Sequence, residues 1–505
     1  MTFSGFPLSG AGGVPPYTWT GTSLPPGLSI IFTAAEYLIN GTPPPGSAGT
    51  YNAMVTMSDA GMPPAPKTVL YPILIHNPPP PVISVTPAPS TGAVNLPYSF
   101  TFTAVSADTP LSWRVSAGTP PAGLGLSDAG VLSGTPTTVG NSSITLIAQD
   151  SVKQDSAPQA FTIDIFAHGF KATGSMAAAR DSQTATLLNT GKLLVAGGTD
   201  PMGKPLASAE LYDPAAGTFS STGSMLTARA HFAATLLPSG KVLVTGGLDA
   251  NGNALQTAEL YDPSLGTFSA TTSAMQFVHA SHTATLLNTG KVLIAGWGNA
   301  VAELFDPSKA TFAPTGSMVK ARVSHTATLL SSGKVLVTGG IQGTGATTLV
   351  LAEAELYDPA TGAFSPTLGS MATARQWHTA SLLAGDKVLV TGGLDINNKA
   401  FPTAELFDPG TLSFTATANT MATARGFQTA TVLHDGTVLV TGGTDGAEAL
   451  VTAEVFDPTA KSFSPTGGMA DTRQSHTATL LPDGRVLVIG GLNATGVLVS
   501  AETYQ

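Results

Sequence analysis

The chain has no cysteine, and charged residues make up only 10% of its 505 positions. Without thiols, disulfides, thiolate metal sites and cysteine nucleophiles are excluded. The formal net charge of -10 is opposite to the basic face that nucleic-acid binding requires. No stretch approaches the ~18 unbroken apolar residues that cross a membrane as a helix. The catalytic patterns HExxH and GxSxG are also missing. We therefore expect no nucleic-acid partner and no membrane span.

Glycine and proline are abundant instead, at 56 and 38 residues, which indicates short strands joined by tight turns. Between Phe170 and Gln505 a pattern of roughly 48 residues occurs seven times, and such a period is typical of propeller blades. The register is marked by one glycine per copy: Gly197, Gly246, Gly296, Gly339, Gly392, Gly442 and Gly490. An Ala-Glu pair follows in each copy, with its glutamate at Glu210, Glu259, Glu303, Glu355, Glu405, Glu454 and Glu502.

This pattern resembles the kelch motif, which combines a diglycine, a downstream glutamate and aromatic residue, and an arginine before the next inner strand. The resemblance covers about two thirds of the chain and implies a seven-bladed β-propeller of four-stranded blades over residues 168–505. Runs such as Val242 to Val244 agree with it, because they are apolar and β-branched as in a strand buried on both faces.

The phase of the repeat predicts how the ring closes. The last copy ends at Gln505, after its Ala-Glu pair and before its outer strand. An extra copy of that outer strand, residues 170–176, precedes the first blade. We expect this segment to complete the seventh blade and so to remove an open sheet edge.

Residues 1–77 and 82–167 share another series of motifs. Each has a tryptophan, at Trp19 and Trp113, followed after 22 and 21 residues by the glycine of a Gly-Thr-Pro motif, at Gly41 and Gly134. The series resembles the Ig-like repeats of bacterial surface proteins and implies two β-sandwiches, each with its tryptophan in the core. The proline-rich residues 78–81 would be a stiff spacer between them.

The first sandwich has nothing like residues 82–97 before its tryptophan. We therefore expect it to lack a strand and the natural protein to extend further towards the N-terminus. The Ig-like resemblance implies an extracellular or cell-surface location, although the chain shows no signal peptide.

Six of the eight arginines occupy one position of the repeat, namely Arg180, Arg229, Arg322, Arg375, Arg425 and Arg473, with His279 there in the third copy. A chain so poor in charge favours pairing of these arginines with the recurring glutamates inside each blade. The alternative is a ring of guanidinium groups that binds an anion.

A second column lies three residues further on and holds the imidazoles His282, His325, His378 and His476. Imidazoles that converge on one point could bind a transition metal. Gln183, Phe232 and Gln428 occupy the same position in the other copies, so structural hydrogen bonding is the favoured interpretation.

The segment from Arg473 to Val486 also resembles the propeller of galactose oxidase. That family places a Tyr-His pair here as copper ligands and forms a Tyr–Cys crosslink. His476 matches the histidine, but Ser475 stands in place of the tyrosine and the chain has no cysteine. We expect kinship in fold without the oxidase chemistry, and no cofactor.

The positions at which the copies differ are the candidates for a ligand site. Between the register glycine and Ala-Glu the third copy is shortest, and Trp297 replaces its second glycine. In kelch propellers the loops before the inner strands and after the diglycines form a binding face. Aromatic and amide side chains suit a sugar ring, so we expect a ligand face built from His231, Trp297, Gln376, Trp377, Phe427 and Gln474.

The resulting hypothesis is a non-catalytic extracellular binding or adhesion protein whose propeller face binds a carbohydrate or a protein partner. Two alternatives remain open. One is a galactose-oxidase-shaped enzyme that acts on sugars by another chemistry. The other is a structural component of a surface layer.

Overall fold

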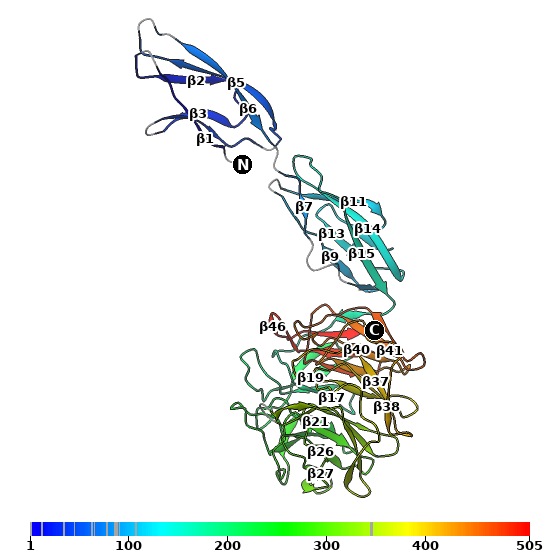
Figure 1. The fold of residues 1–505 in the computed structure, drawn as a ribbon. Coiled ribbons are helices and arrows are strands. Elements are labelled where there is room, and N and C mark those ends of the chain that lie inside the picture. Colours follow the sequence, from blue (N-terminus) through cyan, green and yellow to red (C-terminus); the bar gives the residue numbers. More distant parts are fainter. Residues whose placement is uncertain are drawn as a thin grey trace. The chain divides into compact units, whose positions relative to one another are not determined.

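The computed structural model describes residues 3–11, 14–33, 36–44, 46–61, 64, 66–76, 79–84, 89, 91–106, 109–343 and 347–505. The chain is all-β and forms two compact units, Met1–Ile165 and Phe166–Gln505 (Figure 1). No helix among these residues is long and apolar enough to cross a membrane.

Two three-stranded sheets make up the first sandwich. One has the order β1 (Phe3–Leu8), β4 (Tyr37–Gly41), β3 (Leu28–Phe32), and the other β2 (Thr18–Thr22), β5 (Gly49–Ser58), β6 (Lys67–Ile75). Leu8, Leu28, Ile39 and Val55 form the buried core between them. Trp19 packs against this core but is only partly buried.

The second sandwich contains a fuller version of the same arrangement. Its larger sheet has the order β11 (Ser112–Gly118), β14 (Gly140–Gln149), β15 (Gln159–Phe166), β8 (Gly92–Ala93). The others are β12 (Leu124–Leu126), β13 (Val131–Gly134), β9 (Tyr98–Thr101), and the pair β10 (Ala104–Val105), β7 (Val82–Ile83). Trp113 is buried in the core beside Phe102. In the first sandwich the sheet that contains β6 has three strands among the described residues, without a counterpart of β8.

The expected spacer at residues 78–81 is only partly visible, since Pro78 lies outside the described residues.

The second unit holds seven four-stranded antiparallel sheets among its described residues. Blade one comprises β17 (Thr184–Leu187), β18 (Leu193–Ala196), β19 (Ala209–Asp213) and β20 (Thr218–Ser221). Blade two comprises β21 (Ala233–Leu236), β22 (Val242–Thr245), β23 (Ala258–Asp262) and β24 (Thr267–Ala270). Blade three comprises β25 (Thr283–Leu286), β26 (Val292–Ala295), β27 (Ala302–Asp306) and β28 (Thr311–Pro314). Blade four comprises β29 (Thr326–Leu329), β30 (Val335–Thr338), β33 (Ala354–Asp358) and β34 (Ala363–Pro366).

Blade five comprises β35 (Thr379–Leu382), β36 (Val388–Thr391), β37 (Ala404–Asp408) and β38 (Ser413–Ala416). Blade six comprises β39 (Thr429–Val432), β40 (Val438–Thr441), β41 (Ala453–Asp457) and β42 (Ser462–Thr466). Blade seven comprises β43 (Thr477–Leu480), β44 (Val486–Ile489), β47 (Ala501–Tyr504) and β16 (Phe170–Ala172). The short pairs β31 (Ile341–Gln342) with β32 (Leu349–Val350), and β45 (Leu492–Asn493) with β46 (Gly496–Val497), lie in the loops after the glycines of blades four and seven.

The first strands of successive blades lie side by side around the ring, and β17 of blade one contacts β43 of blade seven. The segment from before blade one supplies the outer strand of blade seven, with Phe170 opposite Tyr504 and Ala172 opposite Glu502. The propeller is therefore closed by pairing of the two ends of the unit, which gives blade seven the same four strands as the other blades.

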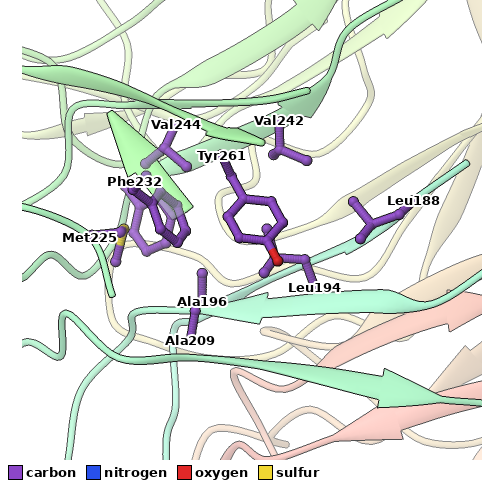
Figure 2. Close-up of a cluster of buried hydrophobic side chains, with 10 residues drawn as sticks. Leu188, Leu194, Ala196, Ala209, Met225, Phe232, Val242, Val244 and Tyr261 are labelled. Carbon is purple, nitrogen blue, oxygen red and sulfur yellow. The ribbon is translucent and has the colours of Figure 1, made fainter. Parts of the chain in front are cut away.

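Apolar side chains fill the space between blades. The second strand of each blade is buried throughout, as its Val-Leu-Val pattern predicts. Between blades one and two, Leu194 and Ala196 of β18 face Val242 and Val244 of β22, and Tyr261 and Phe232 complete the cluster (Figure 2). This packing between neighbours holds each inner strand, and the loop that precedes it, in a defined place.

Candidate functional site

The loop before each inner strand is held by the arginine of the repeat. In six blades this arginine donates to the glutamate of the same blade, at 2.5 to 3.1 Å, and all six guanidinium groups are fully buried. The glutamate also accepts from backbone N–H groups of the incoming loop, as Glu210 does from Ala177 and Ala178. The arginine reaches the carbonyl of the register glycine, as in Arg180 to Gly197 at 2.8 Å. These buried pairs, in which both terminal nitrogens of the guanidinium have partners, are structural.

In blade three an imidazole takes the place of the guanidinium. His279 has Nδ1 2.6 Å from the carbonyl of Gly296 and Nε2 3.3 Å from Glu303. The ring therefore lies between the same two kinds of group, the glycine carbonyl and the glutamate carboxylate, that the guanidinium contacts in the other blades.

Two residues after this column, seven side chains form what we call the αL ring: Ser182, His231, Ser281, Ser324, Trp377, Phe427 and Ser475. All seven have a positive φ, between 45° and 55°, although none is glycine. Their backbones are joined around the propeller, since the N–H of Trp377 donates to Ser324, that of Phe427 to Trp377, and that of Ser475 to Phe427. In the same way, the N–H of Ser324 donates to the carbonyl of Ser281 and the N–H of Ser281 to the carbonyl of His231. The N–H of Ser182 donates to the carbonyl of Ser475.

Among the described residues this chain of hydrogen bonds has one gap, between Ser182 and His231. Each bond crosses from one blade to its neighbour, so ring closure and the strained backbone conformation support each other. The side chains of the αL ring are thereby presented together at one end of the propeller.

The next residue in each blade forms a second layer, which we call the acceptor tier: Gln183, His282, His325, His378, Gln428 and His476, with Phe232 in blade two. All six polar members are bound through Nε2 to the preceding blade. Gln183 donates to the carbonyl of Ile489 at 2.9 Å, and Gln428 to that of Thr391 at 2.8 Å. The imidazoles meet threonine hydroxyls at 2.9 to 3.2 Å.

The four imidazoles of the acceptor tier are neutral. Burial lowers the pKa of His325, His378 and His476 to about 3, and the nearby arginine charges act in the same direction. Burial likewise puts the pKa of His282 well below its usual value, assisted by His279 and His325.

A cavity of about 220 Å³ opens between the two layers over blades two to five. From the αL ring it is lined by His231, Ser281, Ser324 and Trp377, and from the acceptor tier by Phe232, His282, His325 and His378. The lining therefore combines an indole, a phenyl ring, two hydroxyls and neutral imidazoles. None of its described residues is aspartate, glutamate, lysine or arginine.

One carboxylate lies just beyond this lining. Burial raises the pKa of Asp181, while a hydrogen bond with Ser182 and the proximity of His231 oppose that rise. Burial lowers the pKa of His231, and Asp181 opposes the effect. This acid–imidazole pair lies where the chain of backbone bonds in the αL ring is interrupted.

The structure brings only some of the expected ligand residues together. His231 and Trp377 line the cavity. Phe427 stacks on Trp377 from the neighbouring blade, with ring centroids 4.5 Å apart. Gln376 is buried and donates to the carbonyl of Asp395, which is a structural role.

Trp297 and Gln474 are half-buried and are not part of the cavity lining. The N–H of Trp297 donates to the carbonyl of Arg322 at 3.2 Å, as the second glycine does in other blades. The backbone of Gln474 bridges to Leu492.

The candidate metal ligands do not form a metal site. No group of three or more His, Cys, Asp or Glu side chains in the described part of the chain is arranged to hold an ion. The resemblance to galactose oxidase would make His476 a copper ligand, but its Nε2 is bound to Thr429 and Thr441, and its neighbour Ser475 is a link of the αL ring. The residues present do not fit a copper centre.

Comparison with known proteins agrees with this architecture. The family model described as "Putative Ig domain" matches residues 80–166, and the Kelch motif model matches residues 183–226 and 425–470. Among solved structures, the chain is similar to a "novel fungal alcohol oxidase with catalytic diversity among the AA5 family, in complex with copper", with a TM-score of 0.53 and 19% identity over 67% of this chain and 76% of that one. A search of curated proteins gave no significant match.

The chain therefore combines an Ig-like domain with a kelch propeller of galactose oxidase-like fold. At this identity the likeness to the oxidase concerns the fold alone.

Sequence reasoning missed Ser281, Ser324 and Phe232 as cavity residues. The two serines occupy the same repeat position as His231 and Trp377, and that position was the available signal. Serine is too small to suggest a ligand contact from the sequence, although small residues on one side of the ring are what make room for the cavity.

Proposed function

We propose that the propeller is a non-catalytic carbohydrate-binding module and that its site is the cavity beneath the αL ring. The observation that carries this proposal is the lining, in which the Trp377 indole stands beside Ser281, Ser324 and neutral imidazoles. An aromatic face packs against the C–H surface of a sugar ring, and hydroxyls and imidazoles bond its hydroxyl groups.

The size of the cavity supports a small ligand. A volume of about 220 Å³ suits a single sugar ring, for example the terminal residue of a glycan. The Ig-like sandwiches would then carry the propeller at a cell surface, as the resemblance to bacterial surface repeats implies.

A glycan array tests this proposal with the full-length chain, its Trp377→Ala variant, and Trp297→Ala as a matched control outside the cavity. Selective binding that is lost in Trp377→Ala and kept in Trp297→Ala supports the proposal. Absence of binding to any glycan contradicts it and favours a protein partner or a surface-layer role. Thermal unfolding of both variants shows whether a loss of binding reflects a loss of folding.

One observation favours a second candidate, an enzyme that acts on sugars by acid–base chemistry. Asp181 and His231 are a coupled acid and imidazole at the edge of the cavity. Sugar turnover by the wild-type protein that disappears in Asp181→Asn would establish this function. Stable binding of a sugar without turnover would contradict the enzyme and support the non-catalytic binding module.

A further inference from the structure

Trp377 stands between two unlike neighbours in the αL ring. Its N–H donates to the carbonyl of Ser324 in blade four, and its own carbonyl accepts from the N–H of Phe427 in blade six. Phe427 places its ring on the indole, with centroids 4.5 Å apart and an interplanar angle of 27°, whereas Ser324 brings only a hydroxymethyl group. The aromatic packing of Trp377 within the αL ring therefore comes from one side.

The stack leaves one face of the indole for a ligand. The inner strand of blade five contacts that of blade four on one side and that of blade six on the other, so Ser324 and Phe427 flank Trp377 from opposite directions. Trp377 belongs to the cavity lining together with Ser281 and Ser324, and Phe427 is not part of that lining. Phe427 therefore covers the indole face that is turned away from the cavity, and the opposite face is turned towards the two serines.

The indole needs a partner to keep this orientation. Trp377 is only half-buried, and a tryptophan side chain at an open position occupies several rotamers. A ligand that stacks on a mobile indole must order it, which weakens binding. An offset aromatic stack orders the indole in advance, because it adds attraction beyond the buried area. The backbone beneath the stack is fixed as well, since both residues have positive φ values, 51° and 53°, and a hydrogen bond joins them.

We propose that Phe427 is the positioning residue of the carbohydrate site. It holds the Trp377 indole with its free face towards Ser281 and Ser324, and it raises the affinity without touching the sugar. This inference rests on the proposed function and goes beyond it, because it assigns a part in binding to a residue outside the cavity lining. The sequence predicts Phe427 as a direct ligand contact, whereas in this arrangement it acts through Trp377.

The αL ring supplies variants that separate the ring of Phe427 from its backbone. Serine is native at this position in blades one, three, four and seven, with the same backbone conformation, so Phe427→Ser removes the phenyl ring and keeps a side chain that the fold accommodates. Phe427→Tyr restores an aromatic ring. Phe427→Leu keeps apolar bulk without a ring and is used if the serine variant fails to fold. Ser475→Ala is the matched control, because Ser475 is the other neighbour of Phe427 in the αL ring and lies outside the cavity lining.

Fluorine NMR of the full chain labelled with 5-fluorotryptophan reports on the indole directly. The chain has four tryptophans, and the resonance that Trp377→Phe removes belongs to Trp377. We expect this resonance to move in Phe427→Ser, which loses the ring current of the stacked phenyl group, and to return in Phe427→Tyr. The remaining tryptophan resonances should stay in place, which a general loss of structure would not allow.

Titration with methyl glucoside, galactoside, mannoside and N-acetylglucosaminide, followed by the same resonance, gives the affinities. For the glycoside that binds the wild type best, Phe427→Ser should weaken binding ~3–10-fold, the range expected for one aromatic pair. Phe427→Tyr and Ser475→Ala should bind within ~2-fold of the wild type.

The outcomes separate this role from carbohydrate binding itself. Wild-type affinity in Phe427→Ser would overturn the positioning role and leave carbohydrate binding intact. A loss of affinity without any movement of the Trp377 resonance would overturn it as well, because Phe427 would then act by another route. If neither these glycosides nor the glycans of the array bind the wild-type protein, the proposed function fails and the positioning role fails with it.

Discussion

Arg375 and Glu405 face each other inside blade five, where Nη2 of the guanidinium donates to Oε1 of the carboxylate across 3.1 Å and both side chains are buried. The same carboxylate accepts from the N–H of Ala372, and the same guanidinium donates to the carbonyls of Gly392 and Thr403. One ion pair thus connects the incoming loop, the end of the second strand and the start of the third. Five further blades repeat this arrangement with their own arginine.

Arg375→Ala should lower the free energy of unfolding of the propeller by ~3–5 kcal/mol, because it leaves the charge of Glu405 buried and unpaired. Lys387→Ala, in the same blade, is the control. Its pair with Asp408 is half-exposed, and its loss should cost less than ~1 kcal/mol. Urea unfolding measures both. If Arg375→Ala retained wild-type stability but lost ligand binding, the arginines would have to be reassigned to function.

The neutral imidazoles predict a stability that falls with acid. The histidine pKa is ~6.5 in the unfolded chain and about 3 in the folded protein for His325, His378 and His476. Between these values the unfolded state binds more protons, so stability is fully present above pH ~6.5 and declines as pH falls towards 3. Each such histidine contributes up to ~1.4 kcal/mol per pH unit in that window.

Replacement of His282, His325, His378 and His476 together by glutamine should flatten the dependence of stability on pH between ~7 and 5, a range in which ordinary carboxylates remain ionised. Melting curves at successive pH values follow the effect. An identical slope in the wild-type and the quadruple variant would show that the acid sensitivity has another source.

The second glycine of the pair in blade six should tolerate no side chain. Gly443 has φ +91°, and a Cβ there would lie 2.5 Å from the carbonyl oxygen of Gly426. Gly443→Ala should cost more than ~2 kcal/mol, as strain and a backbone clash combine. Gly436→Ala separates the two causes, because Gly436 has φ +85° with nothing within 4 Å of the new Cβ, and we expect a cost of ~1 kcal/mol. Equal costs would contradict a role for the close approach.

If β16 closes the ring, a proline introduced into this strand should destabilise the propeller and not the sandwiches. Lys171 pairs with Thr503 in the ladder between β16 and β47, and proline there can neither donate nor fit the strand. Lys171→Pro should lower the melting temperature of the propeller and leave the transition of the sandwiches unchanged. Lys171→Thr keeps the backbone donor and should behave like the wild type. An unaltered propeller transition in Lys171→Pro would show that β16 contributes little to closure.

The all-β fold and its kelch propeller could be predicted because the same pattern of strand, turn and paired charged residues recurs seven times along the chain. The buried Val-Leu-Val strands, the glycines after them and the Arg and Glu columns each satisfy a requirement within one blade. The pairing of Arg375 with Glu405, 30 residues apart, follows because both residues keep their place in every period.

The candidate site depended on relations between blades, which a repeat pattern does not contain. Serine, histidine, tryptophan and phenylalanine give no local signal for a positive φ, yet all residues of the αL ring adopt one because each backbone bonds to the neighbouring blade. The sequence predicts Gln376 on the ligand face. In the structure its side chain is buried, and its amide nitrogen donates to the carbonyl of Asp395 in the loop after the diglycine.

The sequence by itself determined the strands, the blade period and the residues of the αL ring and the acceptor tier, because these follow from periodic burial and turn chemistry along the chain. Only the tertiary structure decided that Trp377 would stack on Phe427 and that Ser281 and Ser324 would line a cavity with Trp377. These outcomes depend on which side chains of adjacent blades compete for the same space around the ring, and that competition exists only once the ring has closed.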